Sequence, residues 1–273
     1  MRYGAALALV AAAAWGQPAT PGPSPTAREI VRRSIELDQM NWRRMKDYTW
    51  TARDVERHLD GSGRQKSEQV SEWETLILYG EPYRRMLIDN GKPVADREQD
   101  KLDRYADKLE HETPEQRQRR LAKFEKEREK DREFLREIPD LYDFKLEGDA
   151  VIDGRSVWVI SGAPRPGAQP KRRDARPLLK IRGRIWIDKA EYQWVRLEAE
   201  TTDTISYGVF LARLSPGAKL VFEQKRVNDE VWLPSRMWLR GTGRLGLVKK
   251  LAMEEEVTWS NYRKFQAESK IVE

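Results

Sequence analysis

Side chains that commonly perform chemistry are scarce in this sequence. It contains two histidines, His58 and His111, and no cysteine. Neither histidine stands in an H-E-x-x-H or similar array, and neither has a nucleophile elbow nearby, so we predict no metal site and no Ser-His-Asp triad. The 45 aspartates and glutamates are too numerous to single out a catalytic pair. We therefore predict no catalytic residue, no enzyme activity and no cofactor.

One glycine-rich stretch matches the G-x-G-x-x-G pattern of dinucleotide-binding loops. It runs from Gly241 to Gly246. Such a site needs a helix and a second parallel strand after the glycines, and we expect too few residues for that unit before Glu273. The apolar residues that follow share the odd-numbered face, which is strand periodicity: Leu247, Leu251, Met253, Val257 and Trp259. We therefore interpret the glycines as a hairpin turn and not as a nucleotide site.

Tryptophan is unusually frequent. The chain has 10, and eight of them fall in predicted strands: Trp50, Trp73, Trp158, Trp186, Trp194, Trp232, Trp238 and Trp259. Aromatic side chains pack well on sheet faces, which accounts for them without a ligand. The alternative is a curved sheet whose apolar concave side binds an apolar ligand. A large apolar concavity is the default hypothesis for a binding site where catalytic groups are missing.

The charge of the chain suggests its surroundings. Charged residues make up 35% of the sequence and leave a net charge of +6. We expect mild attraction to anionic surfaces such as lipid head groups, and no nucleic-acid partner. The Pro-rich basic segment Pro164–Pro177 is interpreted either as a flexible connection or as a contact with an anionic head group or acidic partner.

The N-terminal sequence predicts export. Arg2, the apolar run Ala5–Ala14 and the small residues before Gln17 form a cleavable signal peptide over residues 1–16. A Pro-rich tether follows over residues 17–25, and we expect a single domain over 26–273. Because the chain has no lipobox cysteine, we predict a free periplasmic protein without a lipid anchor, whose core holds by packing alone.

Hydrophobic periodicity outlines an antiparallel sheet with helical additions. Thr26–Lys46 is predicted as a helix, and period-two strands begin at Tyr48, with Asn90-Gly91 as a type I′ hairpin turn. The charged segment 96–138 interrupts them. It predicts two helices, one ending near His111 and one from Pro114 to Glu137, and these form either a solvated surface or a functional lid or arm. Strands resume at Tyr142.

The hairpin around residues 183–200 is apolar on both faces. A loop of Lys189–Gln193 predicts three cross-strand pairs: Ile187 with Val195, Ile185 with Leu197, and Arg184 with Glu198. A shorter loop would oppose Arg184 with Arg196, which is unfavourable. The aliphatic face then meets the core. Trp186 and Trp194 lie on the other face, where another structural element or a ligand must pack against them.

The layout and this hairpin resemble a known family. The element I-R-G-R-I-W-I-D followed by W-V-R-L-E-A-E, together with DNGKPV at Asp89–Val94, is similar to LolA/LolB-like outer-membrane lipoprotein-sorting proteins and their RseB/MucB-type relatives. The resemblance implies an α+β fold: a strongly curved antiparallel β half-barrel with an N-terminal helix, here with an inserted charged helical pair. It also implies an apolar cavity for acyl chains, without catalysis or cofactor.

Two functions from different classes follow from this resemblance. One is a monomeric periplasmic carrier or chaperone-like protein that binds lipid or the acyl chains of lipoproteins. The other is an envelope sensory or interaction module that binds a protein partner. A hydrolase is a third alternative, which requires titratable groups with shifted pKa values in one cleft. We expect the cavity lining to include Trp50, Trp73, Ile77, Met86, Ile88, Ile185, Ile187, Val195, Leu197, Val209 and Leu211.

Overall fold

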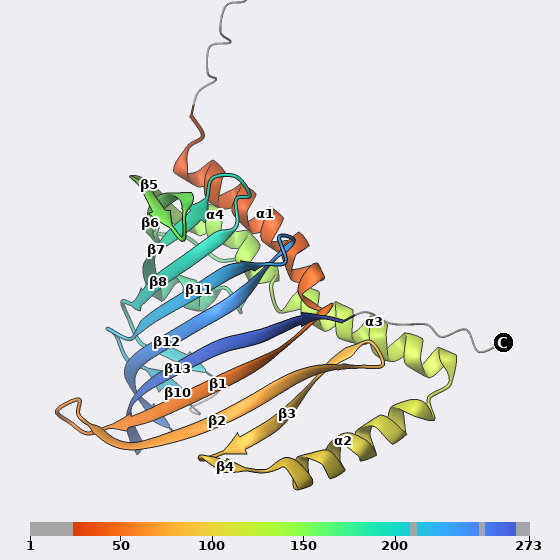
Figure 1. Cartoon of the computed structure of the whole chain (residues 1–273). Coiled ribbons are helices and arrows are strands. Elements are labelled where there is room, and N and C mark those ends of the chain that lie inside the picture. Colours follow the sequence, from red (N-terminus) through yellow and green to blue (C-terminus); the bar gives the residue numbers. More distant parts are fainter. Residues whose placement is uncertain (1–23, 208–211, 246–248, 266–273) are drawn as a thin grey trace, which may run out of the picture.

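The computed structural model describes residues 24–207, 212–245 and 249–265 (Figure 1). These residues form an α+β structure with one large antiparallel sheet, an N-terminal helix and inserted helices, as predicted. The signal peptide and most of the Pro-rich tether lie outside the described residues. The helices are α1 (Ala27–Met45), α2 (Ala95–Glu110), α3 (Pro114–Lys130) and α4 (Ile138–Leu141), with the short 3₁₀ helices η1 (Glu133–Glu137) and η2 (Arg176–Lys180).

Thirteen strands are described, and they belong to one sheet. Its order is β4-β3-β2-β1-β13-β12-β11-β8-β7-β6-β5, with β10 paired to β12 and to β9. The strands are β1 (Tyr48–Leu59), β2 (Gln65–Leu78), β3 (Glu81–Asp89), β4 (Lys92–Pro93), β5 (Tyr142–Ile152), β6 (Arg155–Pro164), β7 (Ile181–Asp188), β8 (Trp194–Thr201), β9 (Ile205–Tyr207), β10 (Ala212–Leu214), β11 (Lys219–Val227), β12 (Val231–Leu245) and β13 (Lys249–Lys264).

The sheet is open, which corrects one part of the expected fold. β4 and β5 form its two edges and do not meet, and the strong curvature of a half-barrel is not what the structure shows (Figure 1). Helix α1 contacts β12, β5 and β7, and α4 contacts β5. Near β5–β8 the apolar face is therefore covered by packed helices, so the sheet does not need to curl over itself to bury it.

Helix α1 begins where its sequence provides a cap. The Thr26 hydroxyl accepts from the Glu29 N–H, and the Glu29 carboxylate accepts from the Thr26 N–H at 2.7 Å, which completes a capping box. The buried residues recur at helical spacing and form one face: Ile30, Val31, Ser34, Asp38 and Asn41. This face lies against the sheet.

The inserted segment 96–138 forms helices as predicted, although the second one is interrupted. α3 starts at the expected Thr113-Pro114 cap and ends at Lys130, and η1 follows. α3 has no buried residue, so little apolar packing is available to extend it. α2 is anchored better, because Leu109 is fully buried and Tyr105 stacks on Tyr83 of β3 with ring centroids 5.2 Å apart.

Two turns test the sequence patterns directly. Asn90 and Gly91 have φ values of 49° and 77°, as a type I′ hairpin turn requires, and the prediction is confirmed. Gly241 and Gly243 do not form a turn: β12 continues to Leu245, and Gly243 pairs with Leu214 of β10 and Leu251 of β13. Gly246 lies outside the described residues. A Cβ on Gly243 would lie 2.3 Å from the Arg213 carbonyl oxygen. Glycine is needed there for the close approach of β10.

The central hairpin has the predicted register at two of three pairs. Ile185 faces Leu197 and Arg184 faces Glu198, whereas a bulge after Trp186 places Ile187 opposite Trp194 and not opposite Val195. A bulge turns the following side chains to the other face. As a result Trp194 joins the aliphatic side chains, and Val195 packs on the opposite face with Trp186.

Candidate functional site: an apolar cavity beneath the first helix

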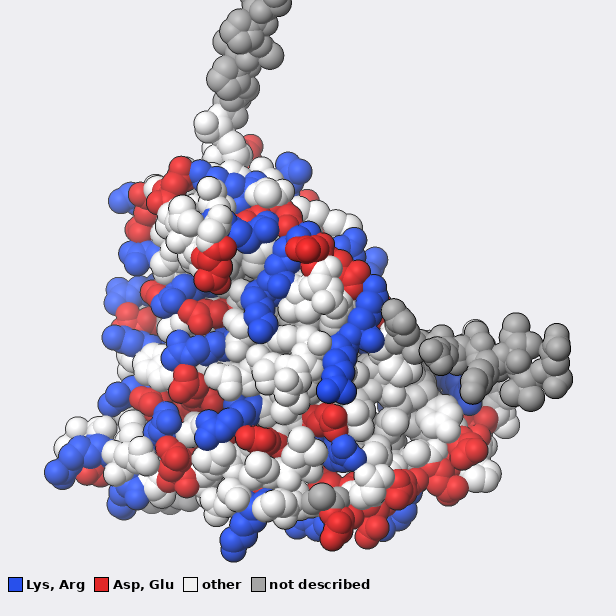
Figure 2. Space-filling model, viewed as in Figure 1, with Lys and Arg blue, Asp and Glu red and all other residues white. Residues whose placement is uncertain are grey.

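The two faces of the sheet differ in character. The inner face, which meets α1, carries in-register apolar side chains such as Ile160, Ile185, Leu197 and Phe222. The outer face carries ion pairs across successive strands: Glu147–Arg184, Arg182–Glu200, Arg196–Glu223, Arg236–Glu256, Arg57–Glu254 and Arg57–Glu68. In Figure 2 alternating blue and red rows follow the left of the molecule, and uncharged surface fills much of its middle. Only the inner face is suited to an apolar ligand.

A cavity of about 350 Å³ lies between α1, η1, α4 and the inner face of β5–β8. Its walls are almost wholly apolar, with Asp38 and Ser34 as the buried polar residues on α1. The side chains that line it include Val31, Ser34, Ile35 and Asp38 of α1, Phe134, Leu135 and Ile138 of the η1–α4 segment, and Phe144, Ile160, Ile185, Trp194, Leu197 and Leu220 of the sheet.

A second hollow shares part of this wall. It measures about 400 Å³ and has Ile181, Ala199 and Leu220 in common with the first cavity. It continues along the inner face towards Leu239 and Met253. A third hollow, of about 650 Å³, is lined by Arg182, Arg184 and Glu200 together with Phe144, Leu220 and Trp238, so its wall is both charged and apolar.

Of the predicted lining residues, Ile185 and Leu197 lie in the wall of the first cavity. Ile187 is fully buried beside it, in a cluster with Ile30, Val31 and Ile160. Val195 packs on the other face with Val157 and Trp232. Trp50 packs near Tyr48 and Leu233, and the remaining described candidates are partly buried on β2 and β3: Trp73, Ile77, Met86 and Ile88. Val209 and Leu211 lie outside the described residues.

The sequence prediction missed the helical half of the cavity. The apolar positions of α1, among them Ile35, and the pair Leu135 and Ile138 were visible as helical stripes. Only the fold shows that these two stripes face each other across the same strands. The contribution of Trp194 was hidden by the bulge.

Asp38 and its partners form one end of the cavity. Asp38 is only 5% exposed, and its carboxylate accepts from Trp194 Nε1 at 2.8 Å and from Arg132. The guanidinium groups of Arg128 and Arg132 both lie over the Trp42 ring, 4.9 and 4.5 Å from its centroid. Burial lowers the pKa of Arg128, while Glu125 acts in the opposite direction and the nearby charge of Arg132 reinforces the decrease. This end is therefore polar and positively charged.

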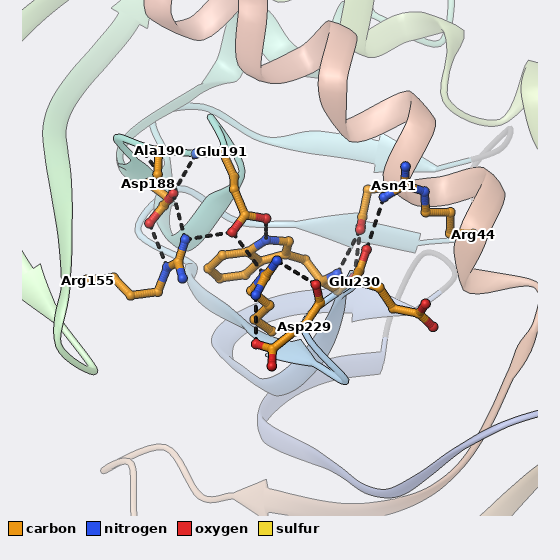
Figure 3. A network of polar contacts seen from close by, with 10 residues as sticks. Asn41, Arg44, Arg155, Asp188, Ala190, Glu191, Asp229 and Glu230 are labelled. Carbon is orange, nitrogen blue, oxygen red and sulfur yellow. Dashed lines mark hydrogen bonds and ion pairs between the residues drawn. The ribbon is translucent and has the colours of Figure 1, made fainter.

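A second polar network fixes the loop of the central hairpin (Figure 3). Asp188 is 1% exposed and accepts from Arg155 at 2.7 and 3.0 Å and from the N–H groups of Ala190 and Glu191. Burial acts to raise the pKa of Asp188, but the hydrogen bonds from Arg155 and Glu191 hold this pKa below its usual value. Glu191 in turn accepts from Trp232 Nε1 at 3.0 Å.

The same network reaches α1. Asn41 donates to the Trp232 carbonyl at 2.8 Å and accepts from the Trp232 N–H at 2.7 Å, and Arg44 donates to the Glu230 carbonyl (Figure 3). α1 is therefore held to β12 by a satisfied buried amide. The wall that α1 contributes to the cavity has a fixed position.

Two carboxyl groups on the inner face lie away from this cavity. Burial raises the pKa of Asp54 on β1, and the charge of Glu56 adds to it. Burial also raises the pKa of Glu255 on β13, and the negative charge of Asp54 raises it further. Among the described residues, no group of three or more histidine or acidic side chains is placed to hold a metal ion, and no helix is long and apolar enough to cross a bilayer.

Comparison with known proteins gives structural similarity at low identity. No family model and no curated protein matches the sequence. Among solved structures, a Vibrio parahaemolyticus domain named for outer membrane lipoprotein sorting matches 88% of this chain and 95% of its own, with 13% identity and a TM-score of 0.34. A LolA superfamily protein from Nitrosomonas europaea matches 89% and 94%, with 9% identity and a TM-score of 0.33.

The Pseudomonas aeruginosa MucA/MucB complex provides a third similar chain. The match covers 88% of this chain and 99% of the matched chain in that complex, with 10% identity and a TM-score of 0.25. The matching structures include ones named for the LolA superfamily and for MucB.

Proposed function

We propose that this protein binds the acyl chain of a lipid or lipoprotein in the cavity beneath α1 and carries it through the periplasm. The observation that supports this proposal is the cavity itself, which is enclosed by α1, η1 and the inner face and has almost wholly apolar walls. Its volume of about 350 Å³ lies within the ~300–1,000 Å³ typical of small-molecule sites. The adjoining hollow at Leu220 extends the apolar wall for a longer chain.

Acyl binding needs no catalytic group. Each methylene that leaves water for an apolar wall contributes about 0.8 kcal/mol, so a chain of six or more carbons accounts for useful affinity by burial alone. The site residues in this proposal are those that line the cavity, with Ile185 and Leu197 from the sheet and Ile35 from α1 as central members. Chain length and fit, and not a reaction, would decide which ligand is held.

We further propose that the segment from α3 to η1 is the lid of this cavity. Phe134 and Leu135 of η1 line the cavity, and the contacts of the segment with α1 are polar: Arg132 with Asp38, Arg136 with Gln39 at 2.9 Å, Arg43 with Glu129 at 3.4 Å and Lys46 with Glu125 at 3.3 Å. Exposed pairs contribute about 0–1 kcal/mol each. The Arg132–Asp38 pair is the buried exception, so opening of the segment mainly requires that this pair is broken.

The remaining parts of the proposal come from the sequence. The predicted signal peptide over residues 1–16 delivers the protein to the periplasm, and the single domain over 26–273 acts there as a monomer. The net charge of +6 favours peripheral contact with anionic membrane surfaces.

The test is binding of an acyl probe to delipidated protein and to a variant with a filled cavity. Leu197→Trp adds a large side chain to the wall, so we expect it to reduce affinity for a fluorescent dodecyl probe at least about tenfold. Val151→Trp, at a position on β5 that is 70% exposed, serves as the matched control and should bind like the unmodified protein. Equal binding by Leu197→Trp and its control would refute the cavity as the ligand site.

The second candidate is an interaction module for a protein partner. It is favoured by the partly buried Trp73, Met86 and Ile88 on β2 and β3, which lie beyond the first cavity. Deletion of residues 96–130, which leaves the lining residues Phe134, Leu135 and Ile138 in place, distinguishes the two functions. If the segment is a lid, it is required for tight acyl binding, and its loss would strongly reduce the affinity for the dodecyl probe. A docking arm for a protein can be removed with acyl uptake intact.

A further inference from the structure

Three buried N–H donors gather at the Asp38 end of the cavity without an acceptor. Trp42 Nε1, Arg128 Nη1 and Arg132 Nε are each inaccessible to solvent and have no hydrogen-bond partner among the described residues. They belong to one cluster, because both guanidinium groups lie over the Trp42 ring. Buried donors are almost always satisfied in native proteins, so three in one cluster require an explanation.

The charges around this cluster do not balance it. The Arg128 and Arg132 side chains are 12% and 19% exposed. Asp38 binds Arg132 but also accepts from Trp194 Nε1, and Glu125, 41% exposed, stays 3.9 Å from Arg128 Nη1. Asp47 acts on Arg128 only through its charge. Arg128 donates through Nη2 to the Trp42 carbonyl at 2.7 Å and has no carboxylate within hydrogen-bond distance among the described residues. A partly desolvated guanidinium without a close anion is costly unless another anion arrives.

The cluster adjoins the cavity along both the helix and the lid. Asp38 lines the cavity and Trp42 follows it by one helical turn on α1. On the lid, Arg132 precedes Phe134, another lining residue, by two positions. Trp42, Arg128 and Arg132 do not line the cavity themselves, so a ligand whose tail lies against Ile35 and Leu197 reaches them by extending past Asp38.

We propose that the ligand is an anionic amphiphile, with a carboxylate or phosphate-ester head group held by Arg128, Arg132 and Trp42 and a single acyl chain in the cavity. This proposal rests on the proposed function, because the tail uses the same cavity. An oxyanion accepts from the three free donors and neutralises the excess charge, and charge-assisted hydrogen bonds of this type are about twice as strong as neutral ones. Arginine is well suited to both head groups because the N–H donors of its planar guanidinium group match the spacing of carboxylate and phosphate oxygens.

The test compares ligands that share a tail and differ in the head group. Dodecanoate, dodecyl phosphate and dodecanol are titrated into the delipidated full chain by calorimetry, with acetate and inorganic phosphate as tail-free probes. We expect both anionic amphiphiles to bind at least about tenfold more tightly than dodecanol. Acetate and phosphate should not bind measurably. A preference for one of the two anionic ligands would identify the head group.

Variants then assign the preference to the cluster. Trp42→Phe removes the indole N–H, and Arg128→Gln removes the guanidinium with its charge and its bond to the Trp42 carbonyl. The expected result is a loss of most of the preference for dodecanoate with dodecanol affinity changed less than about twofold. Arg119→Gln, an exposed position on the same helix, is the matched control. Trp42→Phe keeps an aromatic ring beneath both guanidinium groups, so it remains informative if Arg128→Gln fails to fold.

Each outcome separates the two proposals. If dodecanol and dodecanoate bind equally, the head-group site is refuted and the acyl cavity stands. If the anionic preference exists but survives in Trp42→Phe and in Arg128→Gln, the head group binds elsewhere and this assignment is wrong. If none of the dodecyl ligands binds, the proposed function fails, and the head-group site with it. If acetate or phosphate binds as tightly as the amphiphiles, the cluster is a simple anion site without an acyl tail.

Discussion

Trp194 Nε1 donates a hydrogen bond of 2.8 Å to Asp38 Oδ1, across 156 positions of the chain. This bond joins the central hairpin to α1 at the end of the apolar cavity. Because the other oxygen of Asp38 binds Arg132, a single carboxylate connects the sheet, the first helix and the lid. The stability of the site and the position of its lid therefore depend on one buried residue.

Replacement of this carboxylate should be costly. Asp38→Ala leaves Arg132 partly buried without its partner and Trp194 Nε1 without an acceptor, so we expect a loss of about 3–5 kcal/mol in the free energy of unfolding. Urea denaturation measures it. Asp140→Ala is the control, because Asp140 is 72% exposed and lies 3.9 Å from Arg32, and it should cost less than about 0.5 kcal/mol. Similar losses in both variants would contradict the central role of Asp38.

The buried pair of Asp188 and Arg155 predicts sensitivity to acid. The pKa of Asp188 is lowered in the folded state from its ordinary value of 3.8. Its contribution to stability is therefore present above about pH 4 and is lost as the pH falls through the lower, folded pKa. Asp188→Asn should cost about 3 kcal/mol at pH 7, since it leaves Arg155 with Glu191 as its remaining carboxylate partner.

The pH dependence of that variant provides the check. The difference between Asp188→Asn and the unmodified protein should shrink when urea denaturation is repeated at pH 3, because at that pH the carboxyl group of the unfolded chain, with its ordinary pKa of 3.8, is already largely protonated. Asp203→Asn is the control. Asp203 also has a lowered pKa, from its bond to Lys180, but its side chain is 64% exposed. If Asp188→Asn lowered the free energy of unfolding equally at both pH values, Asp188 would stabilise the protein through its packing and not through its charge.

Asp54 and Glu255, the two carboxyl groups with raised pKa values, predict the opposite dependence of folding stability on pH. A carboxyl group whose folded pKa lies above its unfolded value destabilises the protein at neutral pH, and the penalty is relieved as the pH falls through the folded pKa. Asp54 has a raised pKa, and its Oδ1 has no hydrogen-bond partner among the described residues.

Asp54→Asn should therefore stabilise the protein at pH 7, on the order of 0.5 kcal/mol. Thermal denaturation at pH 7 and at pH 4 measures the effect, and the gain should be smaller at the lower pH. Asp100→Asn on the exposed surface of α2 is the control. A lower melting temperature for Asp54→Asn at pH 7 would mean that Asp54 has a partner which outweighs its burial.

The close approach of β10 to β12 makes Gly243 sensitive to a single methyl group. A Cβ there would lie 2.3 Å from the Arg213 carbonyl oxygen, so the backbone must shift. Gly243→Ala should cost about 1–3 kcal/mol in urea denaturation. Gly61→Ala, where nothing lies within 4 Å of the added Cβ, should be neutral or slightly stabilising. Equal effects at the two glycines would indicate that β10 does not pack on β12 in solution.

Local rules predicted the elements of this fold well. The Asn90-Gly91 turn and the Thr113-Pro114 helix start depend on residues within a few positions of each other, and both were confirmed. The hairpin register was correct for Ile185 and Leu197 because alternation and charge pairing agree there. It failed at Ile187 and Trp194, where a bulge depends on how the loop closes on Asp188, which local pattern does not encode.

The cavity was less predictable than the strands. Ile185 and Leu197 could be found from their alternation, but the helical wall at Ile35 and Leu135 comes from segments about 100 residues apart, and only tertiary packing brings them together. The charged lid looked like solvated helix surface because its sequence is mostly charged. The glycines at 241 and 243 suggested a turn, since the sequence alone does not show that another strand crosses there.

The ion pairs on the outer face have a consequence for how this molecule meets others. Opposite charges are already matched from β5 to β2, so a second sheet placed against them would have to strip water from satisfied ions and gain little in return. That side stays hydrated even in a crowded compartment. An apolar partner is therefore expected at the opposite, inner face, which carries the apolar side chains.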